Sequence, residues 1–294
     1  MKKASWRAAV ALVLATPGAV AAATATDLYY ERSVMVAANA RCGLFAPAVG
    51  QALAAGQAQA RGAALRSGWA ERDLDAVQAR AAAKAGSVAC ASPDIALAAG
   101  RVRQGYAAYA RISRMTYPGD WAGWQADRTP SYAQATWRLR QDVRFGWDRM
   151  AFGLVGRGPV KSLLAVAAFA DGAQPYAARL VLRDVALTTG PFLDRRLAGA
   201  GGRIPLAGRL PPRASDQAFM AEARSPAGDD LKPAGAGAAL AFRFPAAASD
   251  ALARLDPREA VAVEFSFSGR SGDTVRTAWV EVGDFAAGRA FVGP

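Results

Sequence analysis

The clearest alternation of hydrophobic and polar side chains lies near the C-terminus, in residues 260–283. Every second side chain is valine or phenylalanine along residues 261–268, and residues 278–282 repeat the alternation. A period of two is typical of a strand that buries one face. Between the two runs, residues 271–274 read Ser-Gly-Asp-Thr, and glycine at the first central position fits a two-residue type II′ turn. The sequence therefore predicts a β-hairpin with one apolar face.

A period of three to four residues dominates the N-terminal part, residues 24–116. Apolar side chains at this spacing form one stripe along a helix. Pro47 suits the first turn of a second helix, Gly68 suits a helix end, and residues 92–94 read Ser-Pro-Asp, an N-cap followed by proline at the first helical position. These signals predict four short antiparallel helices, and we assign residues 24–128 to a helical domain.

Beyond residue 128 the pattern returns to strands. Side chains alternate along residues 137–147, and the apolar positions then change parity, which indicates a bulge or a tight turn near Asp148 and Arg149. Other strand candidates, separated by turns and by Gly- and Pro-rich loops, are residues 160–170, 176–187, 218–223, 240–244 and 287–292. Roughly seven to nine antiparallel strands predict a β-sandwich or open barrel over residues 129–294, so the expected fold class is α+β.

The first 23 residues have the composition of a secretory signal peptide. Lys2, Lys3 and Arg7 form a basic start, an apolar run follows, and small residues extend to Ala23. This pattern predicts a signal peptide in residues 1–23, and therefore a periplasmic or secreted protein. No later segment reaches about 18 consecutive apolar residues, so we expect no transmembrane segment in the mature chain.

The chain contains two cysteines, Cys42 and Cys90, and both lie in the predicted helical domain. Outside the cytosol, two cysteines on packed helices favour a structural disulfide. A redox-active role would require a C-x-x-C motif or an activated thiolate, and the sequence shows neither. We therefore expect a helical bundle linked by a Cys42–Cys90 disulfide.

The chain is basic, with a formal net charge of +12 that falls to +9 when Lys2, Lys3 and Arg7 are removed with the signal peptide. A basic exported protein could bind an anionic envelope surface or an acidic ligand. The arginines are dispersed along the chain, which favours a compositional bias over a dedicated basic patch. No nucleic-acid partner is expected.

Histidine is absent from the chain. Its absence excludes Ser-His-Asp and Cys-His catalysis, histidine-ligated zinc and an imidazole pH switch. Asp229, Asp230 and Asp273 lack the spacing of an EF-hand, and no glycine-rich run has the context of a nucleotide-binding loop. We predict neither a metal nor a cofactor.

The predicted hairpin register places Glu264 opposite Glu281, near Trp279. Facing side chains in an antiparallel pair have Cβ atoms about 5 Å apart, so two carboxylates there need compensation. In one interpretation, one carboxyl keeps a raised pKa and the pair serves a hydrolase of envelope glycans, with Trp279 stacking on the sugar. In the other, which we favour, the pair is exposed and is neutralised by water or by an arginine.

Two further groups of side chains are candidates for ligand binding. Three arginines point to one side of a predicted strand, where they contact phosphate or carboxylate groups or form a solvated face. Two tryptophans in residues 117–128 stack on sugar rings or clamp the two domains together. With Trp279, the candidate ligand-binding residues are Arg138, Arg140, Arg144, Trp121 and Trp124.

The order of elements from Phe244 onward carries a resemblance. A short helix is followed by the strands VAVEFSFSG and TAWVEVG and then by Asp284 and Phe285. This order resembles the C-terminal part of invasion-associated locus B-type proteins over about fifty residues. The resemblance implies an exported bacterial β-sandwich without an agreed enzymatic role, and it assigns no functional residue.

These observations predict an exported, non-enzymatic protein that binds an envelope component or an unknown protein partner. The alternative is a carboxylate-dependent hydrolase that acts on envelope glycans through Glu264 and Glu281. The two interpretations differ in what they require of the hairpin, because only the hydrolase needs both carboxylates in one concave site.

Overall fold

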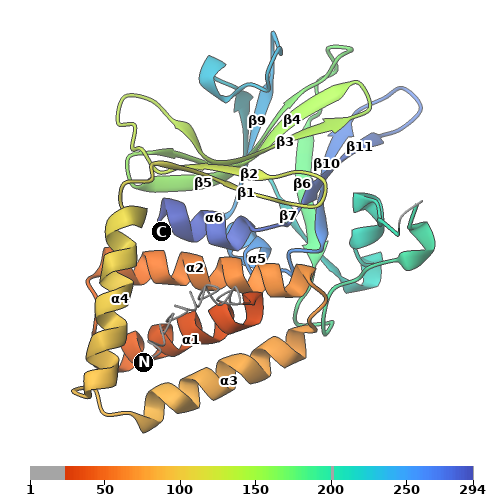
Figure 1. Ribbon diagram of the computed structural model, residues 1–294. Helices are drawn as coiled ribbons and strands as arrows, with labels where there is room; N and C mark the ends of the chain where they lie inside the picture. Colours follow the sequence, from red (N-terminus) through yellow and green to blue (C-terminus); the bar gives the residue numbers. More distant parts are fainter. Residues whose placement is uncertain (1–23, 200–201, 294) are drawn as a thin grey trace, which may run out of the picture.

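The computed structural model of the protein describes residues 24–199 and 202–293, and the predicted signal peptide lies outside the described residues. The fold is α+β, as predicted: four N-terminal helices precede two antiparallel sheets (Figure 1). The helices are α1 (Ala25–Cys42), α2 (Pro47–Arg66), α3 (Glu71–Ser87) and α4 (Pro93–Tyr109). None of the helices in the described residues has the length and apolar character that spanning a membrane requires.

The helices begin at the residues that the sequence indicates. Thr24 and Asp27 form a capping box at the start of α1, and Ser92 caps α4 by accepting a hydrogen bond from the Ile95 N–H at 3.2 Å. The Cys42–Cys90 disulfide is confirmed, with the two Cα atoms 5.7 Å apart. It joins the end of α1 to the segment before α4.

The strands form one sheet of seven and one of four. The large sheet has the order β1-β2-β3-β4-β5-β9-β8 and the small sheet the order β11-β10-β6-β7, with all pairs antiparallel. The strands of the large sheet are β1 (Arg114–Tyr117), β2 (Trp124–Asp127), β3 (Thr136–Phe145), β4 (Asp148–Arg157), β5 (Val160–Ala168), β8 (Ala223–Pro226) and β9 (Leu240–Phe244). Those of the small sheet are β6 (Ala177–Arg183), β7 (Asp216–Met220), β10 (Ala260–Phe267) and β11 (Thr274–Glu281).

The first two strands lie earlier in the chain than the expected start of the β part at residue 129. β1 and β2 form a hairpin, and β2 pairs with β3 through Ala126 and Leu139. The change of parity near Asp148 corresponds to a tight turn at Gly146 and Trp147, one of the two alternatives that the sequence left open.

The two sheets are connected at both sides. At one side the chain passes from β7 directly into β8, where the Ala221 N–H donates to the Ala178 carbonyl and the Glu222 N–H to the Arg243 carbonyl. At the other side the Gln141 side chain of β3 bonds to the backbone of Glu281 in β11. The result is a sandwich that is partly closed, as in an open barrel.

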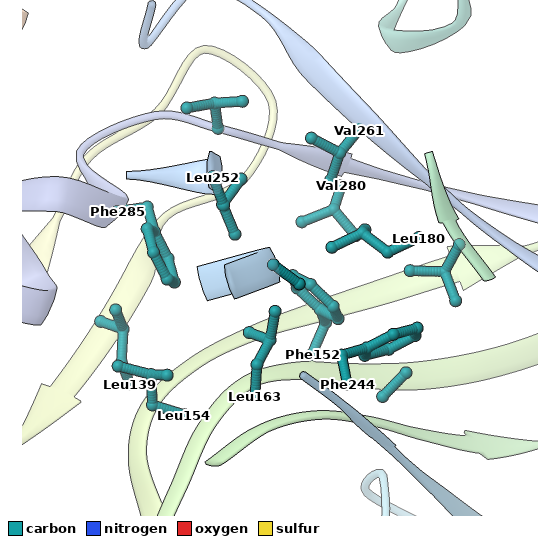
Figure 2. Close-up of a cluster of buried hydrophobic side chains, with 14 of the residues drawn as sticks. Leu139, Phe152, Leu154, Leu163, Leu180, Phe244, Leu252, Val261, Val280 and Phe285 are labelled. Atoms are coloured by element: carbon teal, nitrogen blue, oxygen red, sulfur yellow. The ribbon is translucent and has the colours of Figure 1, made fainter. Parts of the chain in front are cut away.

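The core lies between the inner faces of the two sheets (Figure 2). Phe152 and Leu163 project from the large sheet, and Leu180 and Val261 project from the small sheet, all fully or almost fully buried. Each such side chain contributes roughly 1.5–3 kcal/mol when it is removed from water. Two short helices, α5 (Ala246–Leu252) and α6 (Phe285–Val292), cover the end of this core.

The prediction of a last strand at residues 287–292 is wrong, because these residues form α6. The helix buries Phe285, Phe291 and Val292 against the sheet and contacts α2 on its other side. In Figure 1, α6 lies between α2 and the large sheet. Its buried residues are Phe285, Ala287, Gly288, Phe291 and Val292, which fits a helix that is buried on more than one side.

The predicted register of the C-terminal hairpin is also wrong. Glu264 lies opposite Thr277 and Glu281 lies opposite Ala260, which is a shift of four residues along β11. The connection is the six-residue loop 268–273 rather than a two-residue turn. Because the shift is even, the same side chains still face the core, as the pattern of alternation requires.

Candidate functional site

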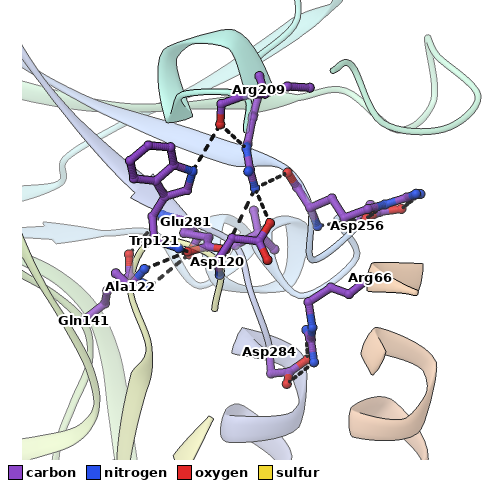
Figure 3. Close-up of polar contacts among 12 residues, drawn as sticks. Arg66, Asp120, Trp121, Ala122, Gln141, Arg209, Asp256, Glu281 and Asp284 are labelled. Carbon is purple, nitrogen blue, oxygen red and sulfur yellow. Dashed lines mark hydrogen bonds and ion pairs between the residues drawn. The ribbon is translucent and has the colours of Figure 1, made fainter. Parts of the chain in front are cut away.

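Glu281 is fully buried and its carboxylate is held by the backbone of the β1–β2 loop (Figure 3). The N–H groups of Asp120 and Trp121 donate to it at 2.7 Å, and the N–H of Ala122 donates at 2.8 Å. A Cβ at Gly119 would lie 2.7 Å from the same carboxylate, so only glycine lets the loop close around it. The arrangement fixes the loop against β11 and leaves the carboxylate no open side.

The reason for this burial is a loop that crosses the outer face of the small sheet. The short helical turn η2 (Leu206–Arg209) packs on β10 and β11. It places the Arg209 guanidinium 3.9 Å from the Glu281 carboxylate and 2.9 Å from that of Asp120. A residue on the nominally polar face of the hairpin is therefore enclosed by a segment distant in sequence.

Glu264 has a different environment. Its carboxylate pairs with Arg179 of β6 at 2.5 Å, which matches the expectation that an arginine compensates it. Glu264 lies opposite Thr277, which is four residues before Glu281 on β11. The two glutamates are therefore roughly 13 Å apart along the strand direction. The carboxylates of a glycosidase lie about 5 to 9.5 Å apart. This geometry gives no support to a catalytic pair.

The predicted arginine row does not form one binding surface. Arg138 is only 4% exposed, and its Nε donates to the carbonyl of Asp127, at the end of the neighbouring strand β2, at 2.8 Å. Burial lowers the pKa of its guanidinium. Arg140 pairs with Asp142 at 2.6 Å, and Arg144 is exposed.

The three predicted tryptophans are also in different environments. Trp124 is fully buried in β2, where its indole N–H donates to the Val282 carbonyl at 2.9 Å. Trp121 donates to the Ile204 carbonyl at 3.1 Å and stacks under Arg203, whose guanidinium carbon is 4.3 Å from the ring centre. Trp279 is half-buried on the outer face of the small sheet. Trp124 therefore joins β2 to the residue that follows β11, and Trp121 joins the β1–β2 loop to the loop before η2.

A large concave region lies where the helices meet the β part. This junction cleft has a volume of ≈ 690 Å³. One wall is the α2–α3 turn and the start of α3, and the other is the loop after β6 with residues that follow α5. The α2–α3 turn and the loop after β6 approach each other in Figure 1. Prominent lining residues are Trp69, Glu71, Asp75, Arg183, Arg254 and Arg258.

The acidic side chains of the junction cleft lie on one wall, and most of its arginines lie on the other. Glu71 and Asp75 lie on the helical wall, with Arg72 beside them, and Arg254 and Arg258 lie on the β wall. Arg61 pairs with Glu71 at 2.9 Å from outside the cleft. A cleft with opposite charges on opposite walls suits a ligand that carries both signs.

The arginines of the β wall are held from behind by buried carboxylates. Arg183 makes two hydrogen bonds with Glu259 at 2.8 and 2.9 Å, and Arg258 makes two with Asp256 at 2.9 and 2.8 Å. Burial raises the pKa of Glu259, and Arg183 opposes this effect. The Arg183 side chain is almost fully buried, so it supports the β wall from behind. Arg258 is partly exposed, and because Asp256 already fixes its planar group, it loses little conformational freedom when it binds a ligand.

Trp69 adds an aromatic surface at the rim of the junction cleft, where its side chain is 42% exposed. No sequence pattern pointed to Trp69, Arg254 or Arg258. Trp69 follows the helix-ending Gly68, so its place in a turn was visible, whereas the approach of residues 254–258 depends on the tertiary fold. The described residues contain no group of three acidic or cysteine side chains arranged to bind a metal ion.

Comparison of the chain with models of protein families, with curated proteins and with solved structures finds no significant match.

Proposed function

We propose that the protein is an exported, non-catalytic binding protein whose junction cleft takes a short zwitterionic ligand, of which a small peptide is the simplest example. The observation that carries the proposal is the separation of charge between the walls of the cleft, with Glu71 and Asp75 on one side and Arg254 and Arg258 on the other. The disulfide supports a location outside the cytosol.

Each end of such a ligand has a matching wall. A carboxylate would bind to the β wall, where Arg258 is already oriented by Asp256 and Arg254 is exposed. An ammonium group would bind to the helical wall, where Asp75 is exposed. An apolar side chain of the ligand would lie against Trp69, since an indole offers a large apolar surface beside a polar edge.

The proposal is tested by calorimetric titration with the tripeptide Ala-Ala-Ala and with the same peptide acetylated and amidated at its ends. We expect the free peptide to bind at least about tenfold more tightly than the blocked peptide, a difference of about 1.4 kcal/mol. Arg254→Gln and Asp75→Asn should each reduce the affinity for the free peptide by a similar factor.

Arg144→Gln is the matched control, because Arg144 is an exposed arginine outside the junction cleft. It should leave the affinity unchanged. Equal affinity for the free and blocked peptides, or no binding of either, would show that the cleft does not recognise charged ends and would refute the proposal.

A further inference from the structure

A second cleft lies at the opposite end of β11 from Glu281. It has a volume of ≈ 660 Å³ and is formed by the β3–β4 turn, the β5–β6 turn and the first residues of β11. We call it the turn cleft. Its lining includes Phe145, Trp147, Asp148, Asp171 and Arg276. None of these residues takes part in the junction cleft.

Trp147 is the most exposed large hydrophobic residue among those the structure describes, at 92%. It follows Gly146, whose φ of 60° permits the tight turn, and the pairing of Phe145 with Asp148 closes the hairpin behind it. The turn is therefore short and well defined. Both faces of the indole meet water, in contrast to the fully buried Trp124.

The floor of the turn cleft is a rigid arrangement of paired charges. Arg276 donates to Asp148 at 3.1 Å and to Asp171 at 3.2 and 2.5 Å. Its guanidinium carbon lies 4.7 Å from the centre of the Phe267 ring. Asp148 also accepts the Ala170 N–H at 2.9 Å. The hydrogen bonds from Arg276 lower the pKa of Asp171 to about 2, so this carboxylate stays ionised at neutral and mildly acidic pH.

The paired groups keep part of their hydrogen-bonding capacity for a ligand. The Asp171 side chain is 54% exposed, and Arg276 is about a third exposed. A carboxylate has about four acceptor sites and a guanidinium five donors, so neither group is saturated by the bonds within the cluster. Acceptors and donors thus lie side by side next to an exposed aromatic ring.

We infer that the turn cleft binds a neutral saccharide, with a sugar ring stacked on Trp147 and its hydroxyl groups bonded to Asp171 and Arg276. Hydroxyl groups both donate and accept, so they can replace the water at a paired carboxylate and guanidinium. An anionic ligand is disfavoured, because Arg276 faces two carboxylates. A protein partner is disfavoured as well, because it would have to remove water from three charged groups at once.

The inference is tested by calorimetric titration of the purified protein with soluble tetramers of glucose and of N-acetylglucosamine. We expect at least one of them to bind, with a Kd on the order of 1 mM or lower. Trp147→Ala should weaken that binding by about tenfold or more. Trp147→Phe should retain part of it, because phenylalanine keeps an aromatic face.

Tyr132→Ala is the matched control, since Tyr132 is an exposed aromatic residue outside both clefts. It should not change saccharide binding, and circular dichroism should confirm that each variant is folded. The inference is refuted if neither tetramer binds, or if Tyr132→Ala and Trp147→Ala lose the same affinity. Binding to the turn cleft does not depend on the proposed peptide site, so the two proposals can fail separately.

Discussion

Two buried glutamates, Glu259 and Glu281, have partners that leave them little freedom for chemistry. Glu259 accepts two hydrogen bonds from Arg183 and one from the Asp256 N–H, and Glu281 accepts three from backbone N–H groups. Such arrangements are costly to disrupt, because removal of one partner leaves a desolvated group without compensation. Substitutions at these residues should therefore act on stability.

Glu281→Gln gives the sharpest test at this scale. An amide keeps one acceptor oxygen but places its NH2 group against at least one of the N–H donors of residues 120–122, and it removes the negative charge beside Arg209. We therefore expect a loss of about 3 kcal/mol in the free energy of unfolding. Glu264→Gln is the matched control, because it removes one partly exposed ion pair and should cost less than about 1 kcal/mol. Urea denaturation measures both values. Equal losses would contradict the role of Glu281 as a buried anchor.

Asp171 predicts a dependence of stability on pH. Its pKa is lowered by the hydrogen bonds from Arg276 in the folded protein, whereas an unfolded aspartate has its ordinary, higher value. Its stabilising contribution is therefore present above about pH 4 and is lost as the pH falls towards 2. Asp171→Asn should be less stable than the native protein at pH 6, and the difference should shrink as urea denaturation is repeated at lower pH. A difference that stays constant with pH would contradict this assignment.

At the scale of elements, local signals predicted the helices and the faces of the strands. Ser92 and Pro93 define the start of α4 because capping is a contact between neighbours in sequence. The register of the C-terminal hairpin was harder to predict. The glycine at 272 fits a two-residue turn, but Gly269 and Gly272 belong to a longer loop, and alternation alone accepts any even shift.

The candidate sites were less predictable than the strands. Arg138 and Glu281 lie on faces that a strand pattern marks as exposed. In the structure Arg138 is buried beside Asp127 of the neighbouring strand, and Glu281 is covered by the loop that contains η2. The β1–β2 hairpin and the η2 loop are short or irregular, so they leave no periodic signal. The exposure of Trp147 had a local cause, a tight turn after Gly146, but its neighbour Asp171 approaches only through sheet pairing.

The disulfide is an element-scale constraint on the helices. It closes a loop with a sequence separation of 48 residues, and Arg41 donates to the carbonyls of Gly86 and Val88 beside it. On the chain-entropy model, replacing Cys42 and Cys90 with serine should lower the free energy of unfolding by about 4 kcal/mol. Urea denaturation of the variant measures this loss. The native protein under reducing conditions should show the same loss. An unchanged midpoint in both samples would show that helix packing alone fixes the α1 end.

At the scale of the whole molecule, α6 links the helices to the sandwich. Asp284, at its start, pairs with Arg66 of α2 through two hydrogen bonds of 2.7 and 2.9 Å. A Cβ at Gly62 would lie 2.3 Å from the Asp284 carboxylate, so α2 and α6 meet closely at that glycine. On the other side, Phe285 packs against Trp124 with the ring centres 5.1 Å apart. One helix therefore contributes to both parts of the structure.

This arrangement predicts that the two parts unfold together. In urea, the loss of helix followed by far-UV circular dichroism should coincide with the change in tryptophan fluorescence, whose reporters lie mostly in the β part. Arg66→Ala should move both curves to lower urea, because it leaves Asp284 buried without its partner. We expect the free energy of unfolding to fall by about 3 kcal/mol. The double variant Arg66→Met with Asp284→Leu should recover much of that loss, since it removes the charge as well as the partner. If Arg66→Ala separates the two curves, with helix lost first, the helices and the sandwich are independent units and α6 belongs to the sandwich alone.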